Sequence, residues 1–274
     1  MSEMTTKQLQ AALAVAIRAA RAAGHLMCRN LHAAKVVNAT TAYDIKLELD
    51  VRCQKLIEKM LGAARPRIAV LGEEGDSGAV NEAYRWVVDP IDGTVNFAYG
   101  IPHACVSIAL QARSVEGEVR NSNPRHPQYV TLVGVVLDPF QNELWTAIRG
   151  GPARLNGRII KVSRRHALSE AIVSMGFGKS RRNVERGLPQ FAWLVRRVRR
   201  VRMMGAAALG LAYVASGRYD AYLERRVSLW DVAAGGLLVE CAGGSFWTKA
   251  IPGKCKLRML ASNGLMQDKL PVPR

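Results

Sequence analysis

The run WVVDPIDGT at residues 86–94 constrains the fold of this chain more than any other feature. Its first three residues are aromatic or β-branched, which predicts a short buried strand that ends at Asp89. Pro90 fixes its own φ and biases Asp89 toward an extended conformation, so the backbone between the two carboxylates is stiff. Asp89, Asp92 and the intervening carbonyl of Ile91 therefore offer hard oxygen ligands, in one short segment, of the kind that Mg²⁺ prefers.

The residues that follow the second aspartate favour a phosphate. Gly93 permits a tight turn, and Thr94 is predicted to be the N-cap of a short helix through Phe97. A helix N-terminus presents unpaired N–H groups and a positive dipole end, both of which suit an anion. The alternative is an ordinary strand-to-turn connection in which the aspartates only cap and solubilise the turn, because such residues are common in turns.

Three further acidic residues stand at the ends of predicted strands or at the start of a helix. Glu73 follows the apolar run 68–71, Asp231 lies in the first turn of a predicted small-residue helix, and Asp50 follows the alternating segment 44–49. Alone, each has a plain explanation, which is a solvated turn, helix-dipole complementation or a helix cap. Together they predict a shared acidic site, since such ends converge in α/β architectures.

Several motifs of this chain resemble those of the inositol monophosphatase family. They are GEE at 72–74, WVVDPIDGTVNF at 86–97, GVVLDP at 134–139, WDVAAG at 230–235 and ECAGG at 240–244, and the resemblance extends from about Ala11 to Asn263. It implies a metal-dependent, lithium-sensitive phosphomonoesterase. It also implies an α/β fold built as an alternating α-β-α-β-α sandwich, the type that the family shares with fructose-1,6-bisphosphatase.

The resemblance also implies a set of metal ligands and catalytic residues. A first Mg²⁺ would be held by Glu73, Asp89 and the carbonyl of Ile91, and a second by Asp89, Asp92 and Asp231. Asp50 would support a more weakly held third ion near Glu73, so the expected cofactor is two to three Mg²⁺ ions. The expected catalytic residues are Glu73 and Thr94, which would orient the attacking water, and Asp50.

The substrate-binding residues implied by the resemblance are Asp92, Gly93, Thr94, Gly205, Ala207 and Glu224. The N–H groups of Gly93 and Thr94 would face the phosphate, and the last three match positions that contact the alcohol. Family positions that commonly hold other residues are occupied by Leu47, Gly75, Ala206 and Ser228, none of which is a predicted metal ligand.

The leading expectation is hydrolysis of inositol 1-phosphate or a similar small polyol phosphate. The alternatives within the family are 3′-phosphoadenosine 5′-phosphate, fructose 1,6-bisphosphate and histidinol phosphate. A bisphosphate would use extra arginines, and Arg225 and Arg226 stand beside Glu224.

The chain has a formal net charge of +17, and five arginines gather between Arg196 and Arg202. One interpretation is a solvated helical face. The other is a surface for polyanions, and some bacterial relatives of the family associate with the transcription machinery, so RNA or a transcription factor is an alternative partner.

Length and composition predict one compact unit of two lobes, 1–150 and 151–274, with the boundary at Gly150-Gly151-Pro152. No uninterrupted apolar run approaches about 18 residues, so no membrane span is expected. Five scattered cysteines favour the reducing cytoplasm. The family resemblance implies a homodimer.

The residue pattern predicts alternating blocks of helix and strand. The predicted helices are 6–31, 51–63, 184–196, 206–216 and 231–241. The predicted strands are 67–71, 86–88, 104–111, 131–137, 143–148, 172–175, 221–224 and 257–261. The polar segment from Ser114 to Tyr129 is predicted to be a hairpin loop.

Overall fold

The computed structural model describes residues 4–42, 44–63, 67–79, 83–114 and 129–272. The helices are α1 (Thr6–Asn30), α2 (Glu48–Gly62), α3 (Thr94–Ala98), α4 (Arg181–Val195), α5 (Ala207–Ala215) and α6 (Leu229–Cys241). The first strands are β1 (Val37–Thr40), β2 (Ile45–Leu47), β3 (Ala69–Gly72), β4 (Gly75–Ser77), β5 (Tyr84–Asp92), β6 (Cys105–Arg113), β7 (Tyr129–Asp138) and β8 (Glu143–Ile148). The remaining strands are β9 (Arg154–Leu155), β10 (Arg158–Ile159), β11 (Ile172–Gly176), β12 (Arg200–Arg202), β13 (Ala221–Ser228), β14 (Ser245–Ala250) and β15 (Lys256–Ser262).

Two large sheets organise these elements. The first has the strand order β10-β9-β8-β7-β6-β5-β3-β4, and the second has the order β12-β11-β13-β15-β14. In the first sheet β3 and β5 run parallel, and in the second β11 is parallel to both β12 and β13. The ends of β3 and β5 therefore lie side by side, which brings Glu73 next to the aspartates that follow Val88.

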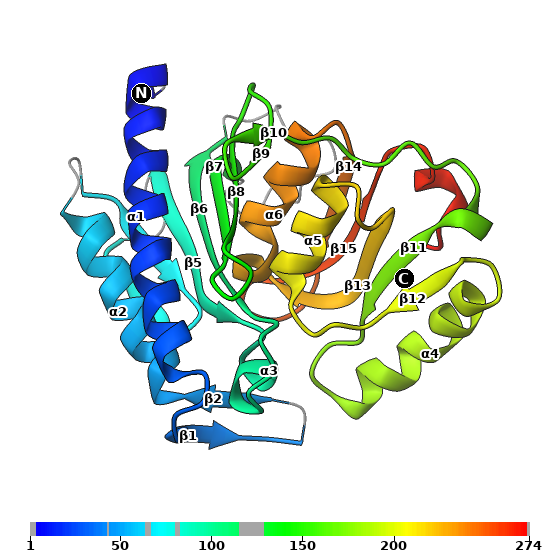
Figure 1. Cartoon of the computed structure of the whole chain (residues 1–274), viewed down its shortest axis with the longest axis horizontal. Coiled ribbons are helices and arrows are strands. Elements are labelled where there is room, and N and C mark those ends of the chain that lie inside the picture. The colour runs from blue at the N-terminus through cyan, green and yellow to red at the C-terminus, as the bar shows by residue number, and fades with distance from the viewer. Residues whose placement is uncertain (1–3, 43, 64–66, 80–82, 115–128, 273–274) are drawn as a thin grey trace.

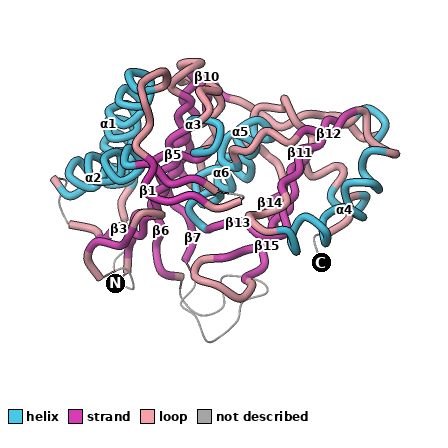
Figure 2. Tube along the Cα trace, turned by 90° about the horizontal axis from the view of Figure 1, so that it is seen from below, coloured by secondary structure: helices cyan, strands magenta, loops and turns pink. Residues whose placement is uncertain are grey.

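Helices cover both sheets, so the molecule is built as five layers (Figure 1). Helices α1 and α2 pack on one face of the first sheet, α5 and α6 fill the space between the two sheets, and α4 covers the outer face of the second sheet. The view from below shows α1 and α2 at one end of the molecule and α4 at the other (Figure 2). The layers confirm the predicted α-β-α-β-α sandwich.

The two central helices, α5 and α6, are almost entirely apolar because a sheet lies on each side of them, and Asp231 and Glu240 near the ends of α6 are their charged residues. Small residues let these layers approach closely. A Cβ added to Gly134 on β7 would lie 2.8 Å from the carbonyl oxygen of Ala234 on α6. A Cβ added to Gly236 would overlap the ring of Phe246. The run of Ala and Gly that predicted a small-residue helix is thus the surface by which α6 fits between two sheets.

Helix α1 begins at a capping box, in which Thr5 and Gln8 satisfy each other's backbone N–H groups. It is the one helix of the described residues that is long and apolar enough to cross a membrane by length and composition. The sequence analysis had expected no such segment, because no uninterrupted apolar run approaches about 18 residues. Its buried face, which includes Ala16, Ala19, Ala20 and Ala23, packs against the first sheet and α2. A core helix passes the same test, and the packing explains the composition of α1 without a membrane.

Most predicted elements are confirmed, with ends that differ by a few residues. The helical-face interpretation of Arg196–Arg202 is wrong, because α4 ends at Val195 and Arg200–Arg202 form the edge strand β12. The sequence analysis also missed the short hairpin of β1 and β2. The hairpin loop predicted from Ser114 to Tyr129 lies almost entirely outside the described residues. The strands that flank it, β6 and β7, pair antiparallel.

The predicted lobe boundary at Gly150-Gly151-Pro152 stays a prediction. Strands β9 and β10 follow this boundary in the chain, yet β9 pairs with β8 of the first sheet. All five cysteines have free thiols, in keeping with their scattered positions in the sequence.

Candidate functional site

Asp89 and Asp92 lie on β5 and reach the same face of the first sheet because the strand is irregular between them. In a regular strand, residues three apart point to opposite faces. Here Asp89 is paired with Ser107 and Asp92 with Cys105, so two residues of β5 oppose one of β6. Such a bulge shifts the alternation of side chains between the two faces by one residue, so Asp92 points to the same face as Asp89. Accordingly, the Ile91 side chain belongs to the core cluster under α1 and α2, whereas Asp92 contacts Cys105 in the cluster under α6.

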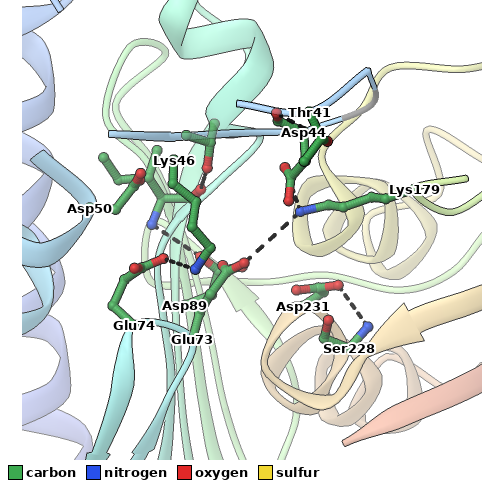
Figure 3. Close-up of polar contacts among 12 residues, drawn as sticks. Thr41, Asp44, Lys46, Asp50, Glu73, Glu74, Asp89, Lys179, Ser228 and Asp231 are labelled. Carbon is green, nitrogen blue, oxygen red and sulfur yellow. Dashed lines mark hydrogen bonds and ion pairs between the residues drawn. The ribbon is translucent and has the colours of Figure 1, made fainter. Parts of the chain in front are cut away.

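Glu73 and Asp231 complete a group of three carboxylates with Asp89 (Figure 3). Glu73 follows β3, and its N–H donates to the carbonyl of Val88 at 3.2 Å. Asp231 is the third residue of α6 and accepts a 2.8 Å hydrogen bond from the N–H of Ser228. One carboxylate oxygen from each of the three residues lies within 4.8 Å of the other two. The predicted convergence of acids from three distant segments therefore occurs in the fold.

Burial raises the pKa of every carboxyl in this group, and repulsion by neighbouring carboxylates adds to the effect of burial at Glu73 and Asp89. Burial, reinforced by the charge of Asp231, raises the pKa of Glu73 from 4.5 to about 7. The pKa of Asp89 is well above its ordinary value because the group is buried and faces Glu73, Asp92 and Asp231. Burial also raises the pKa of Asp231, although the hydrogen bond that it accepts from Asp89 acts in the opposite direction. Ionising all three carboxyls is therefore unfavourable in the absence of a counter-charge. A cation between them would favour their ionised forms and lower their pKa values.

The residues present fit a divalent cation. The donor set is made of carboxylate oxygens, which suit the hard ions Mg²⁺, Ca²⁺ and Mn²⁺ and not a soft ion. The carbonyl of Ile91, another predicted ligand, accepts a 2.9 Å hydrogen bond from the Thr94 hydroxyl and keeps a second lone pair. Asp89 is only 1% exposed, and a charge buried to this degree requires a counter-charge.

Asp50 and Asp92 are near this group but are not members of it among the described residues. One oxygen of Asp50 caps α2 by accepting from the N–H of Leu47 at 2.7 Å, and the other is buried without a hydrogen-bond partner among the described residues. Burial raises the pKa of Asp50 to about 7. Asp92 accepts a 2.6 Å hydrogen bond from the N–H of Ala208, at the start of α5. Its burial, together with the charge of Asp231, raises its pKa to about 8.

The segment that was predicted to bind phosphate differs from expectation in its cap. The N-cap of α3 is Gly93, with a left-handed φ of 92°, so the prediction that Thr94 is the N-cap is wrong. Thr94 is the first residue of the helix. A Cβ at Gly93 would lie 2.9 Å from the carbonyl oxygen of His103, which explains why a glycine stands there.

The predicted alcohol-contacting segment lies beside α3. The side-chain amide of Asn96 donates to the carbonyl of Met204 at 2.7 Å and to that of His103 at 2.9 Å. This links α3 to the chain around Gly205, whose φ is 76°. Ala207 begins α5, the helix whose first turn binds Asp92. Gly205 and Ala207 therefore approach the acidic site from the side of Asp92.

Glu224 lies on β13 and is 9% exposed. Burial raises its pKa to about 7, while a 2.6 Å hydrogen bond from the Tyr222 hydroxyl to its Oε2 acts in the opposite direction. The charge of Asp231 also acts on this pKa, so the two carboxyls belong to one electrostatic environment. The sequence analysis did not single out Tyr222.

Two lysines border the carboxylates, and neither was identified from the sequence (Figure 3). The ammonium of Lys179 lies 2.8 Å from Asp44 and 4.0 Å from Glu73. The ammonium of Lys46 lies 2.9 Å from Glu74. Lys179 follows the carboxyl end of β11, a parallel strand, and that position was the signal available in the sequence.

Comparison with known proteins gives consistent matches over most of the chain. A sequence model described as "Inositol monophosphatase family" matches residues 8–265. The chain is 41% identical over 244 residues to the Nus factor SuhB of Pseudomonas aeruginosa, covering 86% of this chain and 84% of that protein. It is 40% identical over 203 residues to the inositol-1-monophosphatase of Rhizobium meliloti, covering 73% of this chain and 71% of that protein. The crystal structure of the extragenic suppressor protein suhB from Bartonella henselae has a TM-score of 0.83 at 32% identity, covering 94% of this chain and 96% of that one.

Proposed function

Because this chain belongs to the inositol monophosphatase family, we propose that it hydrolyses a small phosphorylated polyol, most specifically inositol 1-phosphate, with Mg²⁺ as cofactor. Family membership supports a metal-dependent phosphatase activity. The observation that carries the proposal is the meeting of Glu73, Asp89 and Asp231, from three distant segments, within 4.8 Å of one another. A structural role alone does not explain three mutually repelling, largely buried carboxyls.

We propose the following metal ligands. The first ion would be held by Glu73, Asp89 and the carbonyl of Ile91, and the second by Asp89, Asp92 and Asp231. Asp50 is the candidate for a third, weaker ion, which gives two to three in all. When bound, Mg²⁺ supplies positive charge that activates water and offsets the charge on the phosphoryl oxygens.

The protein's own groups orient the water and the phosphate in this proposal. The Thr94 hydroxyl donates its proton to the Ile91 carbonyl, so its oxygen remains free to accept a hydrogen bond from water. The carboxylate of Glu73 accepts the second proton of the same water. The N–H groups of Gly93 and Thr94 stand at the start of α3, where no intrahelical acceptor exists for them, and bind the phosphate oxygens.

The alcohol part of the substrate is recognised by Gly205, Ala207 and Glu224. A carboxylate that is held in place by Tyr222 suits a sugar or polyol hydroxyl as a hydrogen-bond donor. Phosphatases for 3′-phosphoadenosine 5′-phosphate, fructose 1,6-bisphosphate or histidinol phosphate are the alternatives within the same chemistry. Faster turnover of a bisphosphate than of inositol 1-phosphate would favour one of them.

The experiment that tests this function is a phosphate-release assay on these esters with Mg²⁺, with and without Li⁺. We expect release from inositol 1-phosphate that requires Mg²⁺ and is inhibited by Li⁺. Asp89→Asn should abolish the activity while the circular dichroism spectrum stays unchanged. Near-normal turnover by a folded Asp89→Asn protein would refute the proposed mechanism.

A second candidate function is contact with RNA or the transcription machinery through Arg196, Arg197, Arg199, Arg200 and Arg202, all of which are exposed. The edge position of β12 gives these charges a simpler role, since charged edge strands resist pairing with other chains. Phosphatase activity is therefore our first proposal. Loss of RNA binding at low salt in a variant with Arg197, Arg199 and Arg200 changed to glutamate would support the second; no affinity in the unchanged protein would eliminate it.

We also propose that the protein is a homodimer in the cytoplasm. The family resemblance supports the first statement, and the five free thiols support the second. Light scattering coupled to size-exclusion chromatography would measure the assembly directly.

A further inference from the structure

Lys179 reaches the carboxylate site from a segment that follows a different sheet from the one that Glu73 follows. It lies between β11 and α4, on the second sheet, whereas Glu73 follows β3 on the first sheet. Its ammonium is 2.8 Å from the Oδ1 of Asp44 and 4.0 Å from the Oε1 of Glu73 (Figure 3). The side chain is 56% exposed, and its ammonium contacts both acids. This makes Lys179 the cation that joins the two sheets at the candidate metal site.

The charges around Glu73 favour a cation at the position of the Lys179 ammonium. Asp231 also acts on Lys179, and its charge adds to that of Glu73 and Asp44 in favouring a cation there. The ammonium of Lys46 also acts on Glu73, and it pairs with Glu74 at 2.9 Å (Figure 3). The edge of the site that faces Asp44 is therefore neutralised by Lys179.

A fixed ammonium and a divalent ion are alternative counter-charges for the same carboxylates. A metal ion at the Asp44 edge would face the repulsion of the nearby ammonium, or would have to displace it from both acids. The residue proposed for a third ion, Asp50, has one carboxylate oxygen engaged as the cap of α2. The same carboxyl lies outside the group formed by Glu73, Asp89 and Asp231 among the described residues.

We propose that the Lys179 ammonium is a built-in counter-charge at the Asp44 edge of the carboxylate site, where it also contacts Glu73, and that it excludes a third divalent cation from this edge. The protein then works with two ions instead of three. This inference rests on the proposed metal site and decides how many ions that site holds.

The test counts bound ions in the absence of substrate. Mn²⁺ is the probe, because it takes the same oxygen ligands as Mg²⁺ and its free form is measured by electron paramagnetic resonance. The proteins are the unchanged chain, Lys179→Met, Lys179→Gln and Lys179→Arg, with Lys254→Met as the matched control. Lys254 forms a 2.9 Å ion pair with Asp76, so its replacement also removes one paired surface ammonium.

We expect Lys179→Met and Lys179→Gln to bind one more Mn²⁺ per chain than the unchanged protein. Lys179→Arg and Lys254→Met should bind the same number as the unchanged protein. Thermal unfolding gives a second measurement, in which Mn²⁺ should raise the melting temperature of Lys179→Met more than that of the unchanged protein.

An unchanged number of ions in folded Lys179→Met and Lys179→Gln would overturn the inference and would mean that metal displaces the ammonium. That result is distinct from failure of the proposed function. In the latter case the unchanged protein itself would bind no Mn²⁺ that depends on Asp89.

Discussion

Replacing Glu73 with glutamine should stabilise the metal-free protein above pH 7 and should remove its response to Mg²⁺. Burial and Asp231 raise the pKa of Glu73 from 4.5 to about 7. The folded state therefore holds this proton more tightly than the unfolded state, so the free energy of unfolding falls as pH rises from 4.5 to 7. Glutamine has nearly the same shape and no charge, so the free energy of unfolding of the variant should not show this fall with pH.

The size of the effect follows from the shift. A shift from 4.5 to about 7 corresponds to about 3 kcal/mol, all of which is lost above pH 7. At pH 5 the folded carboxyl is still protonated and the unfolded one is partly ionised, so the difference falls to about 1 kcal/mol. This net shift already includes the attraction of the Lys179 ammonium, which lies 4.0 Å from Glu73 and lowers the pKa of Glu73.

Urea unfolding in EDTA at pH 5 and pH 8 measures this difference, and a second series contains Mg²⁺. A ligand at 100 times its Kd stabilises the folded state by about 2.7 kcal/mol, and only the unchanged protein should gain this. The difference of about 3 kcal/mol between the two proteins in EDTA at pH 8 should therefore nearly vanish in Mg²⁺. Glu185→Gln is the control, because Glu185 is 59% exposed and pairs only with Arg181 on the helix surface among the contacts of the described residues.

Two results would refute the reasoning. In EDTA at pH 8, a lower stability of Glu73→Gln than of the unchanged protein would show that Glu73 is not held against repulsion. An equal increase in the free energy of unfolding of both proteins in Mg²⁺ would show that the ion binds at a site that does not include Glu73.

Two further substitutions test packing and substrate contact. Gly236→Ala should lower the free energy of unfolding by about 1–3 kcal/mol, because the added methyl meets the ring of Phe246. Gly62→Ala should be neutral or stabilising, because among the described residues the added methyl would meet no atom within 4 Å beyond the neighbouring backbone of its own helix; equal urea midpoints for the two variants would contradict the packing argument. Tyr222→Phe removes a hydrogen bond to Glu224 and should raise KM about fivefold with little change in kcat. A fall in kcat with unchanged KM would place Tyr222 outside alcohol recognition.

The sequence predicted the acidic residues of the site because their signals are local. Strand-forming runs precede Glu73 and Asp89, and a small-residue helix contains Asp231, so each acid is found at the end of a recognisable element. Their meeting was predicted from the general convergence of strand ends. Its physical cause is the parallel pairing of β3 with β5 and the packing of α6 on the same sheet.

The features that were missed depend on contacts between distant residues. The bulge between Asp89 and Asp92 is defined by pairing with β6, and no pattern within β5 alone reveals it. The hairpin of β1 and β2 is short and exposed along β1, so it lacks the alternation that identifies a strand. Arg200–Arg202 looked helical because it follows a helix with similar composition, and only its pairing with β11 makes it a strand.

Gly134 helps to set the geometry of the acidic site. Asp231 can meet Asp89 only if the first turn of α6 lies close to the first sheet. Gly134 permits that approach, because a side chain on β7 at this position would meet the backbone of Ala234. Moving α6 outward would separate carboxylates that now lie within 4.8 Å. In this fold the residues that pack and the residues that bind are therefore coupled, and a substitution at Gly134 should weaken metal binding as well as stability.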